Sequence, residues 1–245
     1  MRSFAADLHI HTALSPCAAP EMTPPAIVQA ARQSGLAMIA VCDHNAAGNT
    51  AAVQAAAGDG LSVLAGMEIA TAEEIHVLGL FPNADAALAA ADEVQHTLPM
   101  ADNAYVARFG EQHLMDAAGT VVGRETRMLA LASMLDLTTT VKLIHGHGGV
   151  AVAAHINRPS FSVLSQLGVF PTNAGFDAIE VFTPAGVPAR PADFAGYGLP
   201  VICSSDSHFP TDIGSTRTTF RMKAPTFDEL VLAFRGVGRR GVACA

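Results

Sequence analysis

Short apolar runs alternate with helix-like segments along most of this chain. The runs with the length and residue types of buried strands lie at 4–9, 37–42, 61–67, 75–81, 150–154, 178–182 and 200–204. Helical patterns at 23–34 and 46–57 separate the first three runs, and Gly35 and Gly58 stand where these helices should stop. This order of strand, helix and strand predicts an α/β fold in which parallel strands are joined by right-handed crossovers.

Polar residues stand, almost without exception, where an apolar run ends. They are Asp7, His9 and His11 at the first run, then Asp43, His44, Glu68, His155, Asp206 and His208 at later runs, with Glu180 inside the sixth. In a parallel barrel the carboxyl ends of all strands meet at one face, where the active site is assembled. An open sheet instead concentrates its chemistry at one switch point. The distribution over many runs therefore predicts a TIM-like barrel.

The fourth run and the region after it depart from this pattern. His76 stands near the start of its run, so as a ligand it would require this strand to enter the barrel differently from the others. Farther on, 85–96 and 125–135 have helical patterns, and 112–123 has the pattern of a short hairpin around Ala118 and Gly119.

These features predict a single domain over residues 1–245, in which 82–140 is an inserted, mainly helical lobe between the fourth and fifth barrel strands. Placed after a strand that carries a ligand, such a lobe would lie over the rim and act as a lid or substrate selector. The alternative is a packing lobe that makes no contact with substrate.

Composition and charge restrict the partners and the compartment. The chain has 245 residues, 50% of them hydrophobic, and a net charge of −8 without a dense basic cluster, which argues against duplex nucleic acid as a partner. A small anionic substrate must then be held by metal ions or a few local cations. The 4 cysteines show no CxxC spacing and favour a reducing, cytoplasmic environment. No apolar run has the length of a membrane span, and no signal peptide is expected. The oligomeric state is left open.

The residue types at the predicted rim point to metal chemistry. His9 and His11 are two apart on a predicted strand, so their imidazoles leave the same face. Histidine, aspartate and glutamate together are ligands for zinc, manganese and iron, and their number here exceeds the needs of one ion. We therefore expect two or three divalent ions, a cluster that activates water and clamps both oxygens of a displacement. Hydrolysis of a phosphate ester or similar anion is the corresponding reaction class.

The residues themselves then carry a resemblance. The motifs are Asp7-Leu8-His9-Ile10-His11-Thr12, Asp43-His44, Gly66-Met67-Glu68, Glu74-Ile75-His76, Ala154-His155-Ile156-Asn157-Arg158-Pro159 and Ser205-Asp206-Ser207-His208. Together, and in this order, they resemble the polymerase and histidinol phosphatase (PHP) family. The resemblance covers almost the whole chain and is weakest in 82–140. It implies a distorted (β/α)7 barrel with up to three metal ions in a phosphoesterase of the nucleotide and small-molecule branch.

Carried over by motif, the resemblance implies three ion positions. The implied ligands are His9, His11, Glu68 and Asp206 for the first ion, Glu68, His76 and His155 for the second, and His44 and His208 for the third. Family members commonly supply a further ligand to the third ion from the loop after the first strand. This chain has Ser15-Pro16-Cys17 there, followed by Glu21, so Cys17 and Glu21 are the candidate replacements.

Further candidates have supporting or binding roles. Glu68 as bridge and Asp206 or His208 as proton-transfer groups are the expected catalytic residues, and Asp7, Asp43 and Glu180 are expected to support the ligands. Arg158 follows His155 by three residues and is the candidate for gripping phosphate oxygens, with Arg217 a weaker candidate. Two alternatives remain open, namely a non-catalytic metal-binding module and a barrel metallohydrolase that cleaves a non-phosphate bond.

Overall fold

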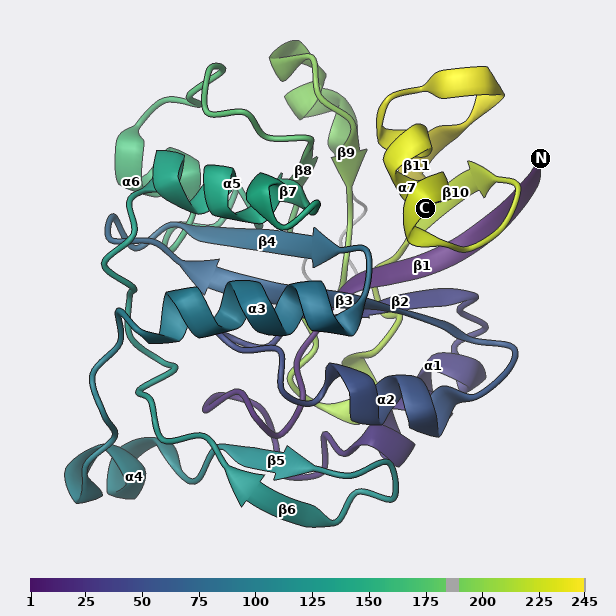
Figure 1. Ribbon diagram of the computed structural model, residues 1–245. Helices are drawn as coiled ribbons and strands as arrows, with labels where there is room; N and C mark the ends of the chain where they lie inside the picture. The colour runs from purple at the N-terminus through teal and green to yellow at the C-terminus, as the bar shows by residue number, and fades with distance from the viewer. Residues whose placement is uncertain (184–189, 245) are drawn as a thin grey trace.

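The computed structural model describes residues 1–183 and 190–244, and over these ranges the chain forms a mixed α/β fold (Figure 1). The main sheet has nine strands within the described residues, in the order β11-β10-β1-β2-β3-β4-β7-β8-β9. Their bounds are β1 Arg2–Ile10, β2 Met38–Val41, β3 Ser62–Ala70, β4 His76–Phe81, β7 Val150–Ala153, β8 Ala178–Glu180, β9 Val201–Ile202, β10 Thr218–Met222 and β11 Gly241–Cys244. The helices are α1 Pro24–Gln33, α2 Thr50–Ala57, α3 Ala84–Gln95, α4 Asn103–Phe109, α5 Leu137–Gly146, α6 Val163–Leu167 and α7 Phe227–Phe234, with 3-10 helices at Pro191–Tyr197, Pro210–Asp212 and Val237–Arg239.

Strand directions explain why one rim collects the polar residues. The pairs β1–β2, β2–β3, β7–β8 and β8–β9 are parallel. Strand β4 pairs antiparallel with both β3 and β7, so its first residue, His76, lies beside the last residues of these two strands. The expectation of an entirely parallel sheet is thus wrong at β4. His76 as a ligand required this strand to enter the barrel differently from the others, and β4 does so by running in the opposite direction. Strand β10, which the apolar runs did not predict, pairs antiparallel with β1 and β11.

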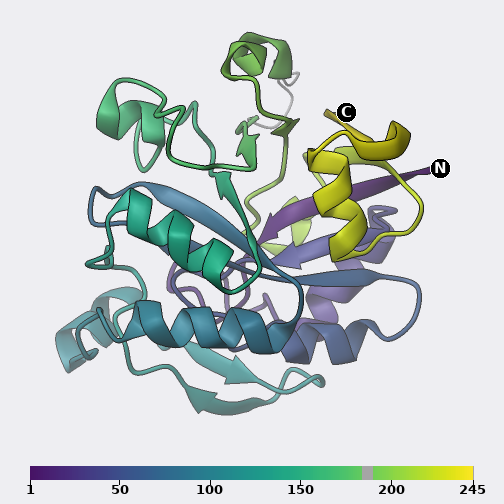
Figure 2. The ribbon, with the colours of Figure 1, turned by 45° about the horizontal axis from the view of Figure 1, so that its top comes forward.

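The sheet is nearly closed into a barrel. Beyond β9, the chain returns to β1, where the Ser207 N–H donates to the His9 carbonyl at 3.2 Å and the His11 N–H donates to the Ser207 carbonyl at 3.0 Å. On the other side of β9, the Thr218 hydroxyl lies 2.8 Å from both the N–H and the carbonyl of Cys203. Figure 2 shows the two chain ends on the same side of the molecule, beside α7. These contacts join the segment that follows β9, at one end of the sheet, to β1 and β10, so the sheet curves around one interior.

Two features of the sequence shape the first barrel unit. Helix α1 begins as predicted, because the Thr23 hydroxyl accepts the Ala26 N–H at 3.4 Å and Pro24 and Pro25 occupy the first turn. The register between β1 and β2 shifts between Asp7 and Ile10. Such irregularities re-aim side chains, and this one lies where the chain delivers its first ligands to the rim.

The interior and the outer layers have separate apolar cores. Alternate strand residues such as Leu8, Met38, Leu78 and Val152 fill the barrel, and Leu230 of α7 packs in the same core. A second cluster lies between the strands and helices α3 and α5, and a third lies under α1 and α2. The barrel is therefore packed, and only the rim is left for chemistry.

Residues 82–140 do not form a clearly separate helical lobe. Helix α3 packs on β3 and β4 as an ordinary barrel helix (Figure 1). The predicted hairpin is present as β5 (His113–Met115) paired with β6 (Val121–Arg124). The helix predicted at 125–135 is wrong, because this stretch is a loop whose backbone groups bond to the rest of the protein. Among the described residues, no helix is long and apolar enough to cross a membrane.

Candidate metal centre

Four ligand-type side chains meet in the buried centre of the rim. His9, His11, Glu68 and Asp206 each place a nitrogen or oxygen within 4.8 Å of the others, and all four are buried. The His9 and His11 Nε2 atoms are 3.2 Å apart, and His11 Nε2 is 3.1 Å from Asp206 Oδ1. Two imidazole nitrogens and carboxylate oxygens directed at one point are the donor set of a divalent cation.

Glu68 belongs to this group and also to a second group, which it forms with His44 and His76. Its Oε1 lies 2.8 Å from His76 Nδ1 and 3.0 Å from His155 Nε2. Its Oε2 lies 3.3 Å from His11 Nε2 and 3.1 Å from His44 Nδ1. Oε2 is buried without a hydrogen-bond partner, which is costly for a carboxylate unless a cation compensates it. A bridging carboxylate between two ions fits this position.

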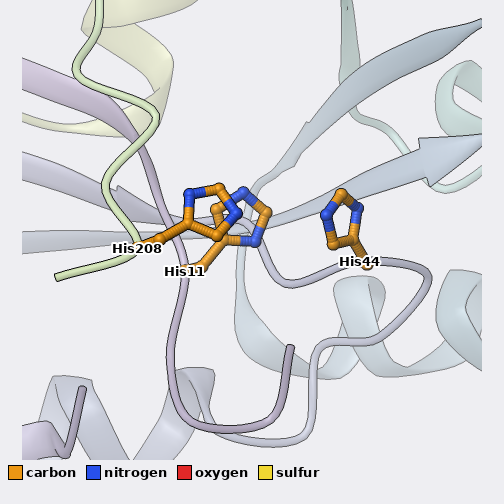
Figure 3. A group of neighbouring side chains, drawn as sticks. All are labelled: His11, His44 and His208. Atoms are coloured by element: carbon orange, nitrogen blue, oxygen red, sulfur yellow. The ribbon is translucent and has the colours of Figure 1, made fainter. Parts of the chain in front are cut away.

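A third group lies nearer the surface. Figure 3 shows His11 and His208 face to face with His44 to one side, and each of the three places a ring nitrogen within 4.8 Å of those of the other two. The His11 and His208 ring centroids are 4.2 Å apart, and those of His11 and His44 are 4.6 Å apart. Cys17, from the loop after β1, places its sulfur 3.0 Å from His208 Nε2. The histidines and carboxylates implied for the three ion positions are therefore brought together, and Cys17 lies beside them, whereas the other loop candidate, Glu21, does not.

Hydrogen bonds at the far ring nitrogens orient the ligands. His9 Nδ1 lies 3.0 Å from Glu180 Oε2, which also accepts the His155 backbone N–H at 3.0 Å. His11 Nδ1 lies 2.9 Å from the Ser15 hydroxyl, which donates to Asp43 at 2.7 Å. Because the Ser15 proton is used by Asp43, His11 carries its proton on Nδ1. In both rings Nε2 is therefore the nitrogen that faces the cluster and can bind an ion once it has lost its proton, as in metal-bound histidine.

Asp7 supports the site from behind. Its carboxylate accepts the Ser205 N–H at 3.0 Å, the Ser205 hydroxyl at 2.5 Å and the Gly214 N–H at 2.9 Å. Burial raises the pKa of Asp7 to about 6 against the lowering effect of these bonds. Asp7 thus fixes the segment that carries Asp206 and His208, and it does not face the ligand cluster.

The charges of the cluster are coupled. Burial opposes ionisation of Glu68, but the adjacent His76, His9 and His44 outweigh it and hold the pKa of Glu68 well below its usual range. Burial likewise opposes the charged form of His11, yet the adjacent Asp206 and Glu68 carboxylates raise the pKa of His11 to about 9. For His208, burial and the nearby His11 lower the pKa to about 4. In the absence of a cation the cluster therefore holds protons between its carboxylates and its inner imidazoles.

Backbone strain is concentrated at the same place. His155 has φ 28° and Asp206 has φ 52°, both in the region that non-glycine residues avoid. Asn45, directly after His44, has φ 49°. Residues in such conformations persist where the surrounding structure determines them, and they cluster at functional sites.

Sequence reasoning missed the amides that connect the rim to residues 82–140. Asn45 donates to the Leu129 carbonyl at 3.0 Å and the Leu131 carbonyl at 2.9 Å. Asn49 donates to the Thr12 hydroxyl and the His113 carbonyl, each at 2.9 Å, and Thr12 donates to Asp43 at 2.8 Å. A hydrogen-bonded path therefore runs from the hairpin to the partners of His11. The only signal in the sequence was the proximity of both asparagines to His44.

The two candidate arginines differ in position. Arg158 Nη1 lies 2.6 Å from Asp206 Oδ2, and its guanidinium lies 4.1 Å over the Phe182 ring. Arg217 instead donates to the Ser34 carbonyl at 2.8 Å, at the end of α1 away from the cluster. Glu21 is exposed and is not part of the ligand groups found among the described residues. The structure thus brings Arg158 to the site and leaves Arg217 and Glu21 outside it.

The other histidine pair has local roles. His145, in the last turn of α5, lies 2.8 Å from Asp177, and His147 at the end of that helix lies 2.8 Å from Glu93. These histidines stabilise the end of the helix.

Comparison with models of known protein families shows which family this chain belongs to. The family model described as "PHP domain" matches residues 7–159, and the one described as "PHP-associated" matches residues 195–236. The chain belongs to the PHP domain family. No curated protein matches the sequence closely enough to be counted a relative.

Solved structures share the fold of this PHP chain. The lesion-specific endonuclease Q of Pyrococcus furiosus matches 98% of the chain with a TM-score of 0.73 at 19% identity, and endonuclease Q in complex with a 27-mer duplex substrate that carries an abasic lesion matches 98% with 0.70 at 18% identity. The chain spans 58% of the length of each of these proteins. A putative metal-dependent phosphoesterase of Bifidobacterium adolescentis is matched over 84% of this chain and 88% of its own, with a TM-score of 0.58 at 21% identity. At these identities the likeness shows the fold.

Membership of the PHP family and the buried cluster of His, Glu and Asp side chains together indicate a metal-binding site. Glu68 is shared between two of the ligand groups, so the arrangement indicates a site for more than one ion.

Proposed function

We propose that this PHP protein is a metal-dependent phosphoesterase that hydrolyses a small phosphorylated metabolite or nucleotide at a site for two or three divalent ions, zinc, manganese or iron. The observation that carries the proposal is the position of Glu68, whose two oxygens lie within 3.4 Å of nitrogens from His9, His11, His44, His76 and His155. Adjacent ions joined by one carboxylate suit an in-line displacement at phosphorus, in which both the entering and the leaving oxygen must be stabilised.

Each residue has a defined task in this reaction. When bound, the ions would activate a water molecule and neutralise charge on the phosphoryl oxygens. Glu68 would hold the spacing of the ions, while Glu180 and the Ser15–Asp43 pair keep the His9 and His11 rings in the binding tautomer. Proton transfer is assigned to the Asp206 carboxylate, which faces His11, or, when no ion occupies the outer position, to His208 Nε2.

Arg158 is the proposed substrate-binding residue. One Nη atom pairs with Asp206, and the side chain is 30% exposed, so further guanidinium N–H groups remain available at the mouth of the site. A guanidinium binds two phosphate oxygens through its planar fork. In a chain with a net charge of −8, such a local cation is needed for the oxygens that the ions do not reach.

Residues 1–245 are proposed to act as one domain in which the region 82–140 limits access to the site. The proposal is supported by the hydrogen bonds that tie this region to the rim. The Gln95 amide donates to the Asn45 carbonyl at 3.2 Å, and the Met115 N–H donates to Asn49 Oδ1 at 2.8 Å. These bonds hold the hairpin and its flanking loops beside the ligands, which suits a substrate selector.

The test is a screen of the purified protein, reconstituted separately with zinc, manganese or iron, against a panel of phosphorylated metabolites and nucleotides. Release of inorganic phosphate or of the free alcohol by the wild type, absent in a His155→Ala variant, is the expected result. Full metal binding without hydrolysis of any phosphate ester would favour the non-catalytic module. Hydrolysis of amide or lactone substrates alone would favour action on a non-phosphate bond.

Cleavage of a DNA strand is a second candidate, favoured by the likeness to endonuclease Q over 98% of this chain. Both candidates break a phosphate ester, so the same centre would serve either. The acidic net charge opposes a long polyanion and favours the small substrate. A duplex with a single abasic lesion, included in the same screen, separates the two: nicking at nanomolar enzyme without turnover of any small ester would replace the first proposal by the second.

A further inference from the structure

Cys17 lies where its sulfur can reach the outer group of ligands. Its Sγ is 3.0 Å from His208 Nε2, and the residue is exposed at the mouth of the site. The loop that carries it is fixed on both sides, because the Ala18 N–H donates to the Ser15 carbonyl at 3.0 Å and the Ala19 N–H donates to the His208 carbonyl at 2.9 Å. The sulfur is thus attached to the same backbone frame as the imidazole that it faces.

The nitrogen that Cys17 faces is the one with a free lone pair. His208 Nδ1 lies 2.8 Å from the Asp206 carbonyl, which accepts only a proton, so the His208 proton is on Nδ1. Nε2 is consequently an acceptor directed at Cys17 and at the space shared with His11 and His44. Beside this group, Glu68 Oε2 is buried without a hydrogen-bond partner, 3.1 Å from His44 Nδ1. The Cys17 sulfur thus lies beside the imidazole nitrogen that His208 directs at the outer group of His11, His44 and His208.

We propose that Cys17 is a thiolate ligand of the outer ion, together with His208 and His44, and that it makes this position selective for a zinc-type ion over manganese or magnesium. This inference rests on the proposed multinuclear centre and concerns the one position of that centre at which a sulfur replaces nitrogen or oxygen.

The geometry fits a tetrahedral ion with a small movement. With Zn–S near 2.3 Å and Zn–N near 2.0 Å, a sulfur and a nitrogen bound to one tetrahedral zinc lie roughly 3.5 Å apart. The observed separation is 3.0 Å, and the exposed Cys17 side chain can open it by about 0.5 Å without disturbing the core. Binding would displace the thiol proton to solvent and form the metal–sulfur bond, with no change in oxidation state.

The two parts of the centre then differ in ligand softness. The inner groups offer only imidazole nitrogens and carboxylate oxygens, from His9, His11, Glu68, His76 and Asp206, which serve manganese, iron and zinc alike. Thiolate ligands favour zinc and disfavour the harder ions. A preparation supplied with both metals should therefore hold zinc at the outer position and accept manganese in the inner ones.

Cobalt(II) substitution tests the proposal, because a cobalt–thiolate bond absorbs intensely in the near-ultraviolet and a cobalt–imidazole bond does not. The variant is Cys17→Ser, which keeps the size of the side chain but removes the sulfur. The matched control is Cys244→Ser, since Cys244 is another partly accessible thiol and lies at the far end of β11. The band should appear in the wild type and in Cys244→Ser, and it should be lost in Cys17→Ser, with zinc affinity at one position reduced at least tenfold while the inner ions remain bound.

A second readout does not depend on any variant. Alkylation of Cys17 by iodoacetamide, followed by mass spectrometry, should slow at least tenfold when zinc is added to the metal-free protein, and should not slow with magnesium. Absence of the cobalt band in the wild type, persistence of the band in Cys17→Ser, or equal alkylation rates with and without zinc would each overturn the inference. Phosphoesterase activity without the band would count against Cys17 ligation alone, whereas the band without any hydrolysis would count against the proposed function alone.

Discussion

Replacing Arg158 with alanine removes a cation that the structure places between a metal ligand and the mouth of the site. Its Nη1 is 2.6 Å from Asp206 Oδ2, while the other oxygen of Asp206 faces His11 at 3.1 Å. Arg158 therefore orients the Asp206 carboxylate as well as offering N–H groups to substrate. Two separate losses are expected in Arg158→Ala, one in metal binding and one in the reaction.

The two losses have calculable sizes. A hydrogen bond to a charged group contributes about 1.5 to 3 kcal/mol. The lower end applies to the pair with Asp206, because the Arg158 side chain is 30% exposed and solvent screens the charge, so metal affinity at the Asp206 position should fall by about tenfold. With the metal positions saturated, the lost contact to a phosphoryl oxygen should lower kcat/KM by roughly ten- to a hundredfold.

The assay separates these effects by measuring kcat/KM as a function of metal concentration. Arg158→Lys should recover part of the activity, because lysine keeps the charge but lacks the planar fork. Arg217→Ala is the matched control, since Arg217 binds the Ser34 carbonyl away from the cluster and its loss should leave both quantities unchanged. Wild-type metal affinity and wild-type kcat/KM in Arg158→Ala would refute the role of this residue.

Three further predictions concern the ligands. The protein purified from cells supplied with zinc or manganese should contain two or three divalent ions per chain, as measured by elemental analysis. The double variant His9→Ala/His11→Ala should lose at least one of these ions, and a metal-free wild type would contradict the proposed site. The pKa of His11 is raised to about 9, so below that pH an entering ion must displace its proton; metal affinity should therefore rise by about one log unit or more per pH unit from 6.5 to 9, and a flat profile by calorimetry would contradict this linkage. Glu180→Leu should weaken metal binding about ten- to a hundredfold by leaving His9 Nδ1 without a partner, while Glu180→Gln should retain more affinity; equal affinities would show that the His9 ring is oriented by other contacts.

The rim was predictable because a strand ends where its apolar pattern ends. Each polar residue that terminates a run is carried to the same face by parallel strands, and no knowledge of loops is needed. His76 was informative for the opposite reason. A ligand at the start of a run can reach that face only if its strand is reversed, and β4 is reversed.

The partners of the ligands were less accessible to sequence reasoning. That Ser15 connects His11 to Asp43 depends on the fold of the loop after β1, which periodicity does not describe. The contact of Arg158 with Asp206 joins residues far apart in the chain. Both require the closed barrel before either side chain has a position.

The wrong helix at 125–135 has a similar cause. The Leu129 and Leu131 carbonyls, which a helix would use internally, instead accept from Asn45, and the Ser133 N–H donates to the Ala70 carbonyl at 2.8 Å. Tertiary hydrogen bonds thus override a local propensity of a few tenths of a kcal/mol per residue. Strand β10 was missed although its burial alternates, since one arginine and two threonines among its five residues resemble the composition of a polar loop.

The reversal of β4 also determines where this chain can vary. In an ordinary barrel unit, the strand ends at the catalytic face and its helix returns the chain to the opposite end. Here β4 ends at the opposite end, and α3 brings the chain up until Gln95 reaches the Asn45 carbonyl beside His44. The segment between α3 and α5, residues 96–136, consequently leaves the barrel and returns to it at the mouth of the site. Segments of other length or composition can be exchanged there by protein engineering without altering the strand order, and each exchange would change what the ligands face.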